Sequence, residues 1–123
     1  MEYDDFRNMS VWQKSVEIVV KVYEVTRSYP IEEKFGLVSD MRRAANSISH
    51  NIAEGYGRFE AKDKTRFYKI SRGSCFELMS QCFVSERLGY LDNKDSNDIV
   101  AKTKEVIKEL NSIIKTLESK KKS

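Results

Sequence analysis

Four long stretches of the chain repeat apolar residues every three or four positions. In the last stretch the repeat is uninterrupted, through Ile99, Thr103, Val106, Leu110, Ile113 and Leu117. This spacing places apolar side chains on one side of an α-helix. The pattern therefore predicts helices over residues of about 10–28, 38–56, 61–88 and 96–118, followed by a frayed tail at residues 119–123.

The segments between these stretches are short and contain residues that interrupt helices. Pro30 ends the first helix, and residues 31–36 after it are expected to form a helical turn or an ordered loop. Glycines lie in the other two connections. Long helices joined by short connections pack as antiparallel neighbours. The sequence therefore predicts an all-α, antiparallel up-down-up-down four-helix bundle that forms a single domain over residues 1–123.

Local signals indicate where individual helices begin and end. Ser10 and Gln13 have the spacing of a capping box, in which each side chain satisfies a free backbone N–H. Asp95 or Ser96 is expected to cap the last helix. The second helix is expected to end at residues 55–57, where glycine supplies a positive φ.

The first helix has more apolar surface than one bundle core requires. Its main seam consists of Trp12, Val16, Val19, Tyr23 and Thr26, and a second stripe beside it consists of Val11, Ile18, Val22 and Val25. Together they cover roughly 220° of the helix, about twice the usual arc. Because large apolar patches are uncommon on monomers, we expect the second stripe to form the interface of a homo-oligomer. The alternative is that Phe6, Met9 or residues 31–35 fold over it.

Positive charge is concentrated in the middle of the chain. The 123 residues include 22 basic and 19 acidic ones, for a formal net charge of +3. Residues 40–72 hold eight basic and four acidic side chains, and a short lysine tail follows at residues 120–122. We expect the eight to bind nucleic acid through its phosphates: Arg42, Arg43, Arg58, Lys62, Lys64, Arg66, Lys69 and Arg72.

Aromatic residues lie among these cations, which strengthens the nucleic-acid interpretation. Phe59, Phe67 and Tyr68 would be available to stack on unpaired bases. The alternative is a solvated helix face, with Phe67 in the core and the charges providing only solubility. The protein would then be a protein-interaction scaffold with no nucleic-acid binding.

Catalytic, metal and cofactor chemistry find little support in the sequence. Cys75 and Cys82 are two helical turns apart, about 10.5 Å, which is too far for a disulfide, so we expect both in the core. His50 is the only histidine and has no nucleophile and base at suggestive spacing. We therefore expect a non-enzymatic protein with no metal and no cofactor. The alternative, an enzyme or small-molecule binder at residues 50–54, requires a deep pocket there.

Polar residues occur where the second and third helices are expected to meet. Asn51 needs partners if it is buried on the Ile48 side, because an unpaired buried amide costs about 1–3 kcal/mol. We expect Asn51, Glu54 and Ser74 to form a structural polar cluster that fixes helix register. Gly73 beside Ser74 lowers helix propensity, which predicts the close approach of a neighbouring helix there.

No apolar run approaches the roughly 20 residues that a membrane-spanning helix needs. Residues 1–7 are acidic and polar and do not resemble a secretory signal. We therefore expect a cytoplasmic protein that has no membrane partner.

A series of short motifs, in order along residues 12–91, resembles one bacterial family. The motifs are Trp12, residues 29–37 (YPIEEKFGL), 42–48 (RRAANSI), 51–58 (NIAEGYGR), Gly73-Ser74 with Glu77-Leu78, and 88–91 (LGYL). They resemble the four-helix-bundle family named for proteins encoded in intervening sequences of 23S ribosomal RNA genes. The accessory variability protein of diversity-generating retroelements is similar to this family too.

This resemblance carries its own expectations. It implies a homopentameric ring of antiparallel bundles, so the expected partners are other copies of the chain. The retroelement protein is understood to bind nucleic acid and a reverse transcriptase through a basic surface. The resemblance therefore implies that nucleic acid, and a protein such as a reverse transcriptase, are further partners of this chain.

Overall fold

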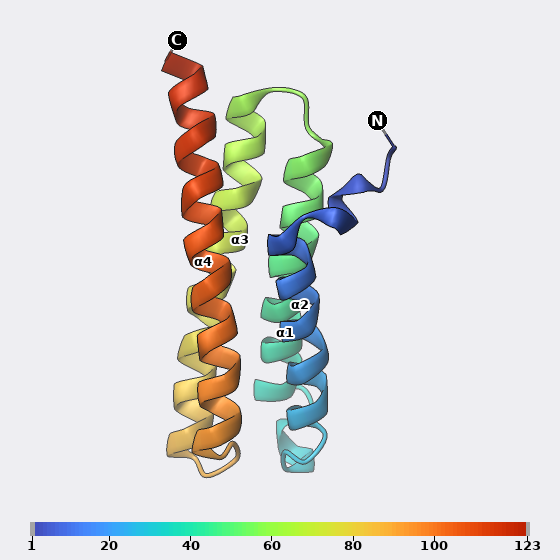
Figure 1. The fold of residues 1–123 in the computed structure, drawn as a ribbon. Helices are drawn as coiled ribbons and strands as arrows, with labels where there is room; N and C mark the ends of the chain where they lie inside the picture. Colours follow the sequence, from blue (N-terminus) through green and yellow to red (C-terminus); the bar gives the residue numbers. More distant parts are fainter. Residues whose placement is uncertain (1, 123) are drawn as a thin grey trace.

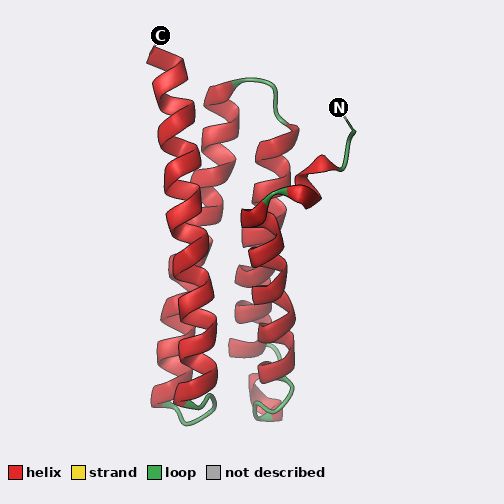
Figure 2. Cartoon of the chain, in the orientation of Figure 1, coloured by secondary structure: helices red, strands yellow, loops and turns green. Residues whose placement is uncertain are grey.

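The computed structural model describes the backbone of residues 2–122 and the side chains of residues 2–120. Its long helices are α1 (Ser10–Thr26), α2 (Leu37–Gly57), α3 (Ala61–Arg87) and α4 (Asn93–Lys122). Two short 3₁₀ helices, η1 (Asp5–Asn8) and η2 (Ile31–Glu33), precede α1 and α2. The described residues contain no strand (Figure 2), and the predicted all-α class is confirmed.

The four helices pack as an antiparallel bundle (Figure 1). Each helix contacts two neighbours, in the pairs α1–α2, α2–α3, α3–α4 and α1–α4, so α1 and α3 lie diagonally opposite. The predicted bounds differ from those observed by at most three residues, except at the end of α4. This helix continues to Lys122, where a frayed tail from residue 119 was predicted, and residue 123 lies outside the described residues.

α1 is the shortest of the four helices, with 17 residues against 30 in α4. It therefore reaches only part of the height of the bundle, and η1 continues outward from its start (Figure 1). The Phe6 ring packs against Trp12 and Tyr56, with ring centroids 5.4 and 6.2 Å apart. The N-terminal segment thus covers α2 near the point where α1 begins.

The core face of α1 is the stripe that the sequence assigned to an oligomer interface. Its members are almost completely buried within a single chain, with exposed fractions of 2, 0, 0 and 9% for Val11, Ile18, Val22 and Val25. The predicted interface is therefore wrong. In the predicted seam, Thr26 is buried, but Trp12, Val16, Val19 and Tyr23 are only partly buried. Both stripes have helical spacing, so only the positions of α2 and α4 decide which one faces the core.

Small side chains line the buried faces of α2 and α3. Ala44 and Ala45 on α2 have no exposed surface, and neither do Ser71 and Cys75 on α3. Short side chains let two helix backbones approach closely. Cys82 is also fully buried, and burial raises the pKa of both cysteine thiols to about 12. The prediction that both cysteines are unpaired core residues is confirmed.

Two glycines have roles different from those predicted. A Cβ at Gly73 would meet no atom within 4 Å, so the close helix approach predicted there is wrong. The close approach occurs at Gly55, where a Cβ would lie 2.7 Å from Cε1 of the buried Tyr68 ring. Position 55 of α2 therefore requires glycine for a steric reason. Residues 55–57 have no positive φ, so the prediction that a positive φ ends the helix there is also wrong.

Gly89 is the residue that uses the conformational freedom of glycine. Its φ is 78°, the one positive φ among the described residues. The N–H of Gly89 bonds the carbonyl oxygen of Glu86 at 3.0 Å, and the N–H of Tyr90 bonds that of Ser85 at 2.9 Å. This pair of bonds is a Schellman motif, which satisfies free carbonyls at the end of α3 and turns the chain toward α4.

The predicted helix caps also differ from those observed. Gln13 Nε2 donates to the carbonyl oxygen of Arg7 at 2.9 Å, and α1 has no side-chain cap, so the capping box does not form. At the start of α4, Asp92 Oδ1 accepts from the N–H of Asp95 at 2.7 Å. Ser96 is buried and donates from Oγ to Glu86 Oε2 at 2.7 Å. The cap therefore lies three residues before the predicted position.

Among the described helices, none combines the length with the apolar composition that a membrane-spanning segment requires.

Alanine substitutions at Gly55 and Gly73 should have opposite effects on stability. Gly55→Ala should lower the free energy of unfolding by about 1–3 kcal/mol, because the buried Tyr68 ring must move. Gly73→Ala should raise it by up to about 1 kcal/mol, because alanine favours the helix and meets no neighbour. Urea unfolding of both variants beside the wild type measures the difference. A stabilising Gly55→Ala would contradict the close contact with Tyr68.

Candidate nucleic-acid interface

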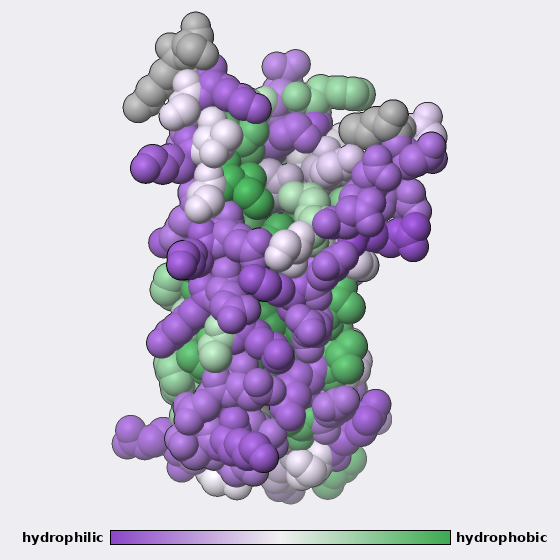
Figure 3. All heavy atoms as spheres, in the orientation of Figure 1, coloured by the Kyte–Doolittle hydropathy of each residue, from purple (hydrophilic) through white to green (hydrophobic). Residues whose placement is uncertain are grey.

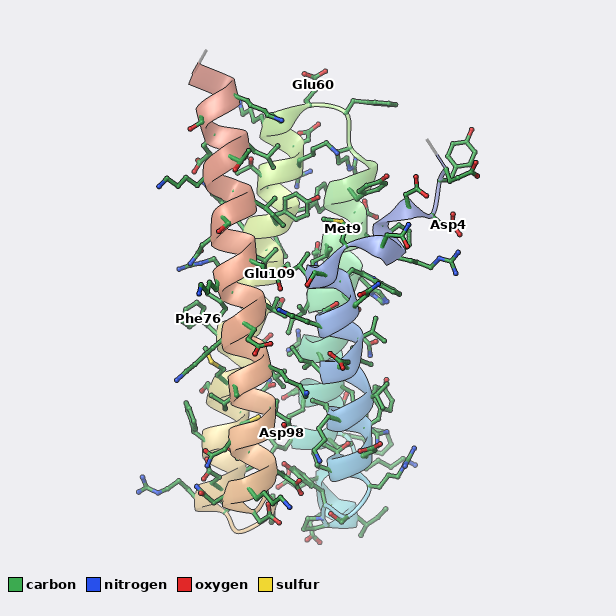
Figure 4. All side chains as sticks on the ribbon, viewed as in Figure 1. Asp4, Met9, Glu60, Phe76, Asp98 and Glu109 are labelled. Atoms are coloured by element: carbon green, nitrogen blue, oxygen red, sulfur yellow. The ribbon has the colours of Figure 1, made fainter. Side chains whose placement is uncertain are left out.

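The connection between α2 and α3 lies at the same end of the bundle as the last turns of α4 (Figure 1). We call this region, made of residues 54–69 and 112–120, the basic end. It contains seven basic and four acidic side chains. Glu60 lies at its tip (Figure 4). Five of the eight predicted nucleic-acid-binding residues belong to it: Arg58, Lys62, Lys64, Arg66 and Lys69.

Two arginines of the basic end lie against one aromatic ring. The guanidinium carbon of Arg58 is 4.5 Å from the centroid of the Phe67 ring, and that of Arg66 is 4.4 Å from it. Phe67 is partly buried, so its ring holds both cations at the surface. Arg58 also forms an ion pair with Glu54 at 3.2 Å, and both of these side chains are exposed. Exposed pairs of this kind contribute little and exchange readily for another anion.

Phe59 adjoins these arginines, and 96% of its surface is exposed. An exposed ring next to two guanidinium groups offers a surface on which an unpaired base can stack. Tyr68, the other aromatic predicted to stack, is only 3% exposed. Its burial raises the pKa of its hydroxyl to about 12. Tyr68 therefore belongs to the core, and the interpretation of it as a base-stacking residue is wrong.

Lys64 performs a structural role at the basic end. Its Nζ donates to the carbonyl oxygens of Gly55 and Tyr56, at 3.2 and 2.7 Å. These carbonyls belong to the last turn of α2, where a cation also interacts favourably with the helix dipole. Partial burial lowers the pKa of the Lys64 ammonium. Lys64 thus joins the start of α3 to the end of α2.

Lys69 and Arg72 extend the basic surface along α3 toward α4. Lys69 Nζ lies 3.2 Å from Glu118 Oε2, and Arg72 Nε donates to Asn111 Oδ1 at 2.8 Å. A hollow at this junction is lined by residues of both helices: Lys62, Asp63, Thr65, Arg66, Lys69 and Glu118. Lys62 and Arg66 form no ion pair among the described residues. Both cations are therefore available to an external phosphate.

Arg42 and Arg43 lie outside the basic end. Arg42 stacks on the Tyr23 ring at 4.5 Å, and its Nε donates to Thr26 Oγ1 at 3.0 Å, so it joins α2 to α1. Arg43 pairs with Glu77 at 2.9 Å and joins α2 to α3. Pairing with Glu77 raises the pKa of the Arg43 guanidinium. The eight predicted residues therefore do not form one continuous surface.

The predicted polar cluster exists with one different member. Ser47 Oγ lies 2.8 Å from Ser74 Oγ, and Asn51 Nδ2 donates to Ser47 Oγ at 3.0 Å. Asn51 Nδ2 also donates to the carbonyl oxygen of Ser47 at 2.9 Å. Ser47 takes the place predicted for Glu54, whose carboxylate turns to Arg58 at the surface. The cluster joins α2 to α3 as expected.

The surroundings of His50 are those of a surface residue. His50 is exposed and borders a hollow that is also lined by Ala53, Glu54, Gly57 and Arg58. Among the described side chains, no group of three or more His, Cys, Asp or Glu residues could hold a metal ion.

One exposed apolar surface was not identified from the sequence. It lies on the outer side of α3, where Phe76, Phe83, Val84 and Leu88 are each about half exposed. Ile70, earlier on the same helix, is 43% exposed. Phe76 and Phe83 lie seven residues apart, on a different side of the helix from Leu78 and Cys82. This spacing was the signal in the sequence that could have identified the surface.

The comparison with protein families identifies the relatives of this bundle. The model described as "23S rRNA-intervening sequence protein" matches residues 7–112, which is most of the chain. The chain belongs to this family. The family predicted from the motifs is confirmed.

A solved structure has a similar fold. It is the crystal structure of a protein with unknown function from the S23 ribosomal protein family of Bacteroides thetaiotaomicron. The two structures agree with a TM-score of 0.79 at 25% sequence identity, over 85% of this chain and 98% of that chain. A comparison with curated proteins found no match. The fold is therefore shared, and the solved protein is described without a function.

The two lysines at the start of α3 should contribute differently to stability. Lys64→Met should lower the free energy of unfolding by about 1 kcal/mol, because the last carbonyls of α2 lose their donor. Lys62→Met removes an exposed charge from the same turn and should change it by less than about 0.5 kcal/mol. Urea unfolding of both variants tests this. Equal losses would show that Lys64 has no special role at the end of α2.

Proposed function

We propose that this family member is a non-enzymatic, homo-oligomeric protein that binds RNA or DNA through the basic end. The observation that carries the proposal is the group formed by Arg58, Arg66 and Phe67 beside the exposed Phe59 ring. Guanidinium groups bind phosphate oxygens, and aromatic rings stack on bases. A flexible single strand exposes both its phosphates and its bases, so it can contact cations and rings that lie side by side.

The mild charge of the chain implies a weak site in each copy. Three ion pairs, Arg58–Glu54, Lys69–Glu118 and Arg43–Glu77, already neutralise part of the positive charge. Weak sites gain affinity when several copies engage one strand together. This argument supports a homo-oligomer, and the resemblance to pentameric relatives supports five copies. A reverse transcriptase partner stays a prediction from the same resemblance.

The non-enzymatic part of the proposal follows from the groups at the basic end. Arginine, lysine and phenylalanine bind and orient a strand, but none of them there is paired as nucleophile with general base. The described side chains nearby add one exposed histidine, His50, and the surface carboxylate of Glu54. We therefore assign binding, and no reaction, to this surface.

A protein-interaction scaffold is the second candidate function. The ion pairs at the basic end favour it, because cations that are matched within the chain provide solubility without a ligand. The two functions differ in one simple measurement. A scaffold should not bind a mixed nucleic-acid pool at low salt, whereas a nucleic-acid-binding protein should bind it and lose affinity steeply as salt rises.

Removing two cations of the basic end should reduce the salt dependence of binding. In the double variant Arg58→Gln/Arg66→Gln, the slope of log K against log salt should fall by about 1.4, or about 0.7 for each single-strand phosphate contact. The charge-matched control is Arg27→Gln/Lys34→Gln, which alters two exposed cations at the opposite end of the bundle. Fluorescence anisotropy with labelled single-stranded RNA and DNA measures both. Equal slopes in the two variants would exclude the basic end as the site.

Loss of the exposed ring should affect single strands selectively. Phe59→Ala should weaken binding to a single strand by about 5- to 150-fold, because one base stack is worth about 1–3 kcal/mol. Duplex of the same sequence should lose little, since its bases are already stacked. Phe35→Ala is the control, because Phe35 is 88% exposed but lies between α1 and α2. Equal losses for strand and duplex would contradict stacking on Phe59.

A further inference from the structure

The hollow at the junction of α3 and α4, which we call the α3–α4 hollow, has a volume of about 380 Å³. Three of its lining residues are cations of α3: Lys62, Arg66 and Lys69. They are spaced by four and three residues, so their side chains lie on one side of the helix. The carboxylates that line the hollow belong to Asp63 and Glu118. Three cations on one side of a helix suit an anion that has several oxygen atoms.

Thr65 gives the α3–α4 hollow a hydroxyl group without a partner. The residue lines the hollow although only 8% of its surface is exposed. Its Oγ1 forms no hydrogen bond with any described residue. By contrast, the buried Thr26 and Thr103 each donate to a carbonyl oxygen of their own helix at 2.7 Å. Because burial fixes the Thr65 side chain, its hydroxyl is positioned in advance for an external acceptor.

Glu118 of α4 already places an anion at one side of the α3–α4 hollow. Its Oε2 lies 3.2 Å from Lys69 Nζ, whereas Lys62 and Arg66 form no ion pair among the described residues. The side chains of Lys69 and Glu118 are both about half exposed, and an ion pair of this kind contributes little to stability. An external anion that contacts all three cations can therefore displace the Glu118 carboxylate.

The terminal phosphate of a nucleic-acid strand is the anion that fits these groups. A phosphate monoester has three free oxygens and a charge of about −1.5 to −2 at pH 7. A phosphate within a strand has two free oxygens and a charge of about −1. The monoester therefore offers more acceptors to the cations and the Thr65 hydroxyl, and its larger charge competes better with Glu118. Because α4 bounds the hollow on one side, the hollow admits the end of a strand more readily than its middle.

The α3–α4 hollow adjoins the arginines and rings of the basic end. Arg66 lines the hollow, and its guanidinium carbon lies 4.4 Å from the centroid of the Phe67 ring. Figure 3 shows hydrophobic atoms exposed beside hydrophilic ones at the top of the view, where the α2–α3 connection lies. The exposed Phe59 ring belongs to this connection. A strand whose terminal phosphate lies in the hollow can therefore pass Arg66 and stack a nearby base on Phe59.

We propose that the α3–α4 hollow binds the terminal phosphate of a single nucleic-acid strand, and that the Glu118 carboxylate occupies this site until the phosphate displaces it. The proposal rests on the nucleic-acid binding of the proposed function and names the part of the strand that the basic end recognises. Lys62, Arg66 and Lys69 bind the phosphate oxygens, and Thr65 donates a hydrogen bond to one of them. Strands that end in a phosphate are preferred over strands that end in hydroxyl groups.

Strands that differ only in their ends test the proposal. Single strands of one sequence, made as RNA and as DNA with an internal fluorescent label, carry a 5′-phosphate, a 3′-phosphate or hydroxyl groups at both ends. Fluorescence anisotropy should show that one phosphorylated form binds about 10- to 100-fold more tightly than the hydroxyl form, because hydrogen bonds to a charged group are strong. The preferred form identifies the end that is bound. Inorganic phosphate should remove this advantage, and chloride at the same ionic strength should not. Equal affinities for all three forms would overturn the proposal.

Thr65→Val distinguishes the α3–α4 hollow from the general positive charge of the basic end. Valine keeps the shape of threonine without the hydroxyl, and no hydrogen bond within the described chain is lost. The ratio of the affinities for the phosphorylated and hydroxyl strands should fall by about tenfold. Thr103→Val, at a buried position of α4, is the matched control and should keep the wild-type ratio. Circular dichroism confirms that both variants are folded. An unchanged ratio in Thr65→Val would contradict the site.

Removing the internal anion should have the opposite effect. Glu118→Gln should strengthen binding of the phosphorylated strand by about two- to fivefold, because Lys69 then has no carboxylate to exchange. Glu77→Gln is the charge-matched control, since Glu77 forms a similar exposed ion pair with Arg43 outside the basic end. Equal gains in the two variants would reflect net charge alone and would overturn the role of Glu118 as a competitor.

The hydroxyl-ended strand separates this proposal from the proposed function. If that strand binds at the basic end and a terminal phosphate adds nothing, the proposed function stands and the phosphate site is overturned. If terminal phosphate and inorganic phosphate bind but the hydroxyl-ended strand does not, the α3–α4 hollow is supported and binding along the strand is overturned. If none of them binds, both proposals are overturned.

Discussion

α2 and α3 pack against each other through small side chains, and the other features of the bundle depend on this contact. Because these side chains are short, polar groups of one helix reach the other. Ser71 Oγ donates to the carbonyl oxygen of Ile48 at 2.8 Å, and the Ser47–Ser74 bond lies close by. Each bond can form at only one offset of the two helices along the bundle axis. The register of α3 on α2 is therefore fixed by specific hydrogen bonds as well as by apolar burial.

This register determines which part of α3 faces solvent at each level. The first half of its outer side carries Lys62, Arg66 and Lys69, and the second half carries Phe76 and Phe83. The cations of the basic end and the exposed phenylalanines thus occupy consecutive parts of one helix and do not overlap.

The cations of the chain divide by what surrounds them. Lys64 and Arg42 contact groups of neighbouring helices, and these contacts hold the bundle together. Lys62 and Arg66 have no ion-pair partner among the described residues. The sequence cannot separate these groups, because charge and spacing are the same for a cation that caps a helix and one that faces solvent. Only the position of the α2 carbonyls distinguishes Lys64 from Lys62.

The sequence by itself determined the four helices, their antiparallel order and the family, because helical spacing, short connections and the residue 51–58 motif are local properties. The membership of Asn51 and Ser74 in one polar cluster, which Ser47 joins, and the burial of both cysteines were also predictable. Tertiary structure alone decided which of two apolar stripes on α1 enters the core, and that Gly55 rather than Gly73 meets a neighbouring helix. Both stripes have the same helical period, and each glycine lies inside or at the end of a predicted helix. What differs is the presence of another helix or the Tyr68 ring at that position, which only the packing of distant residues provides.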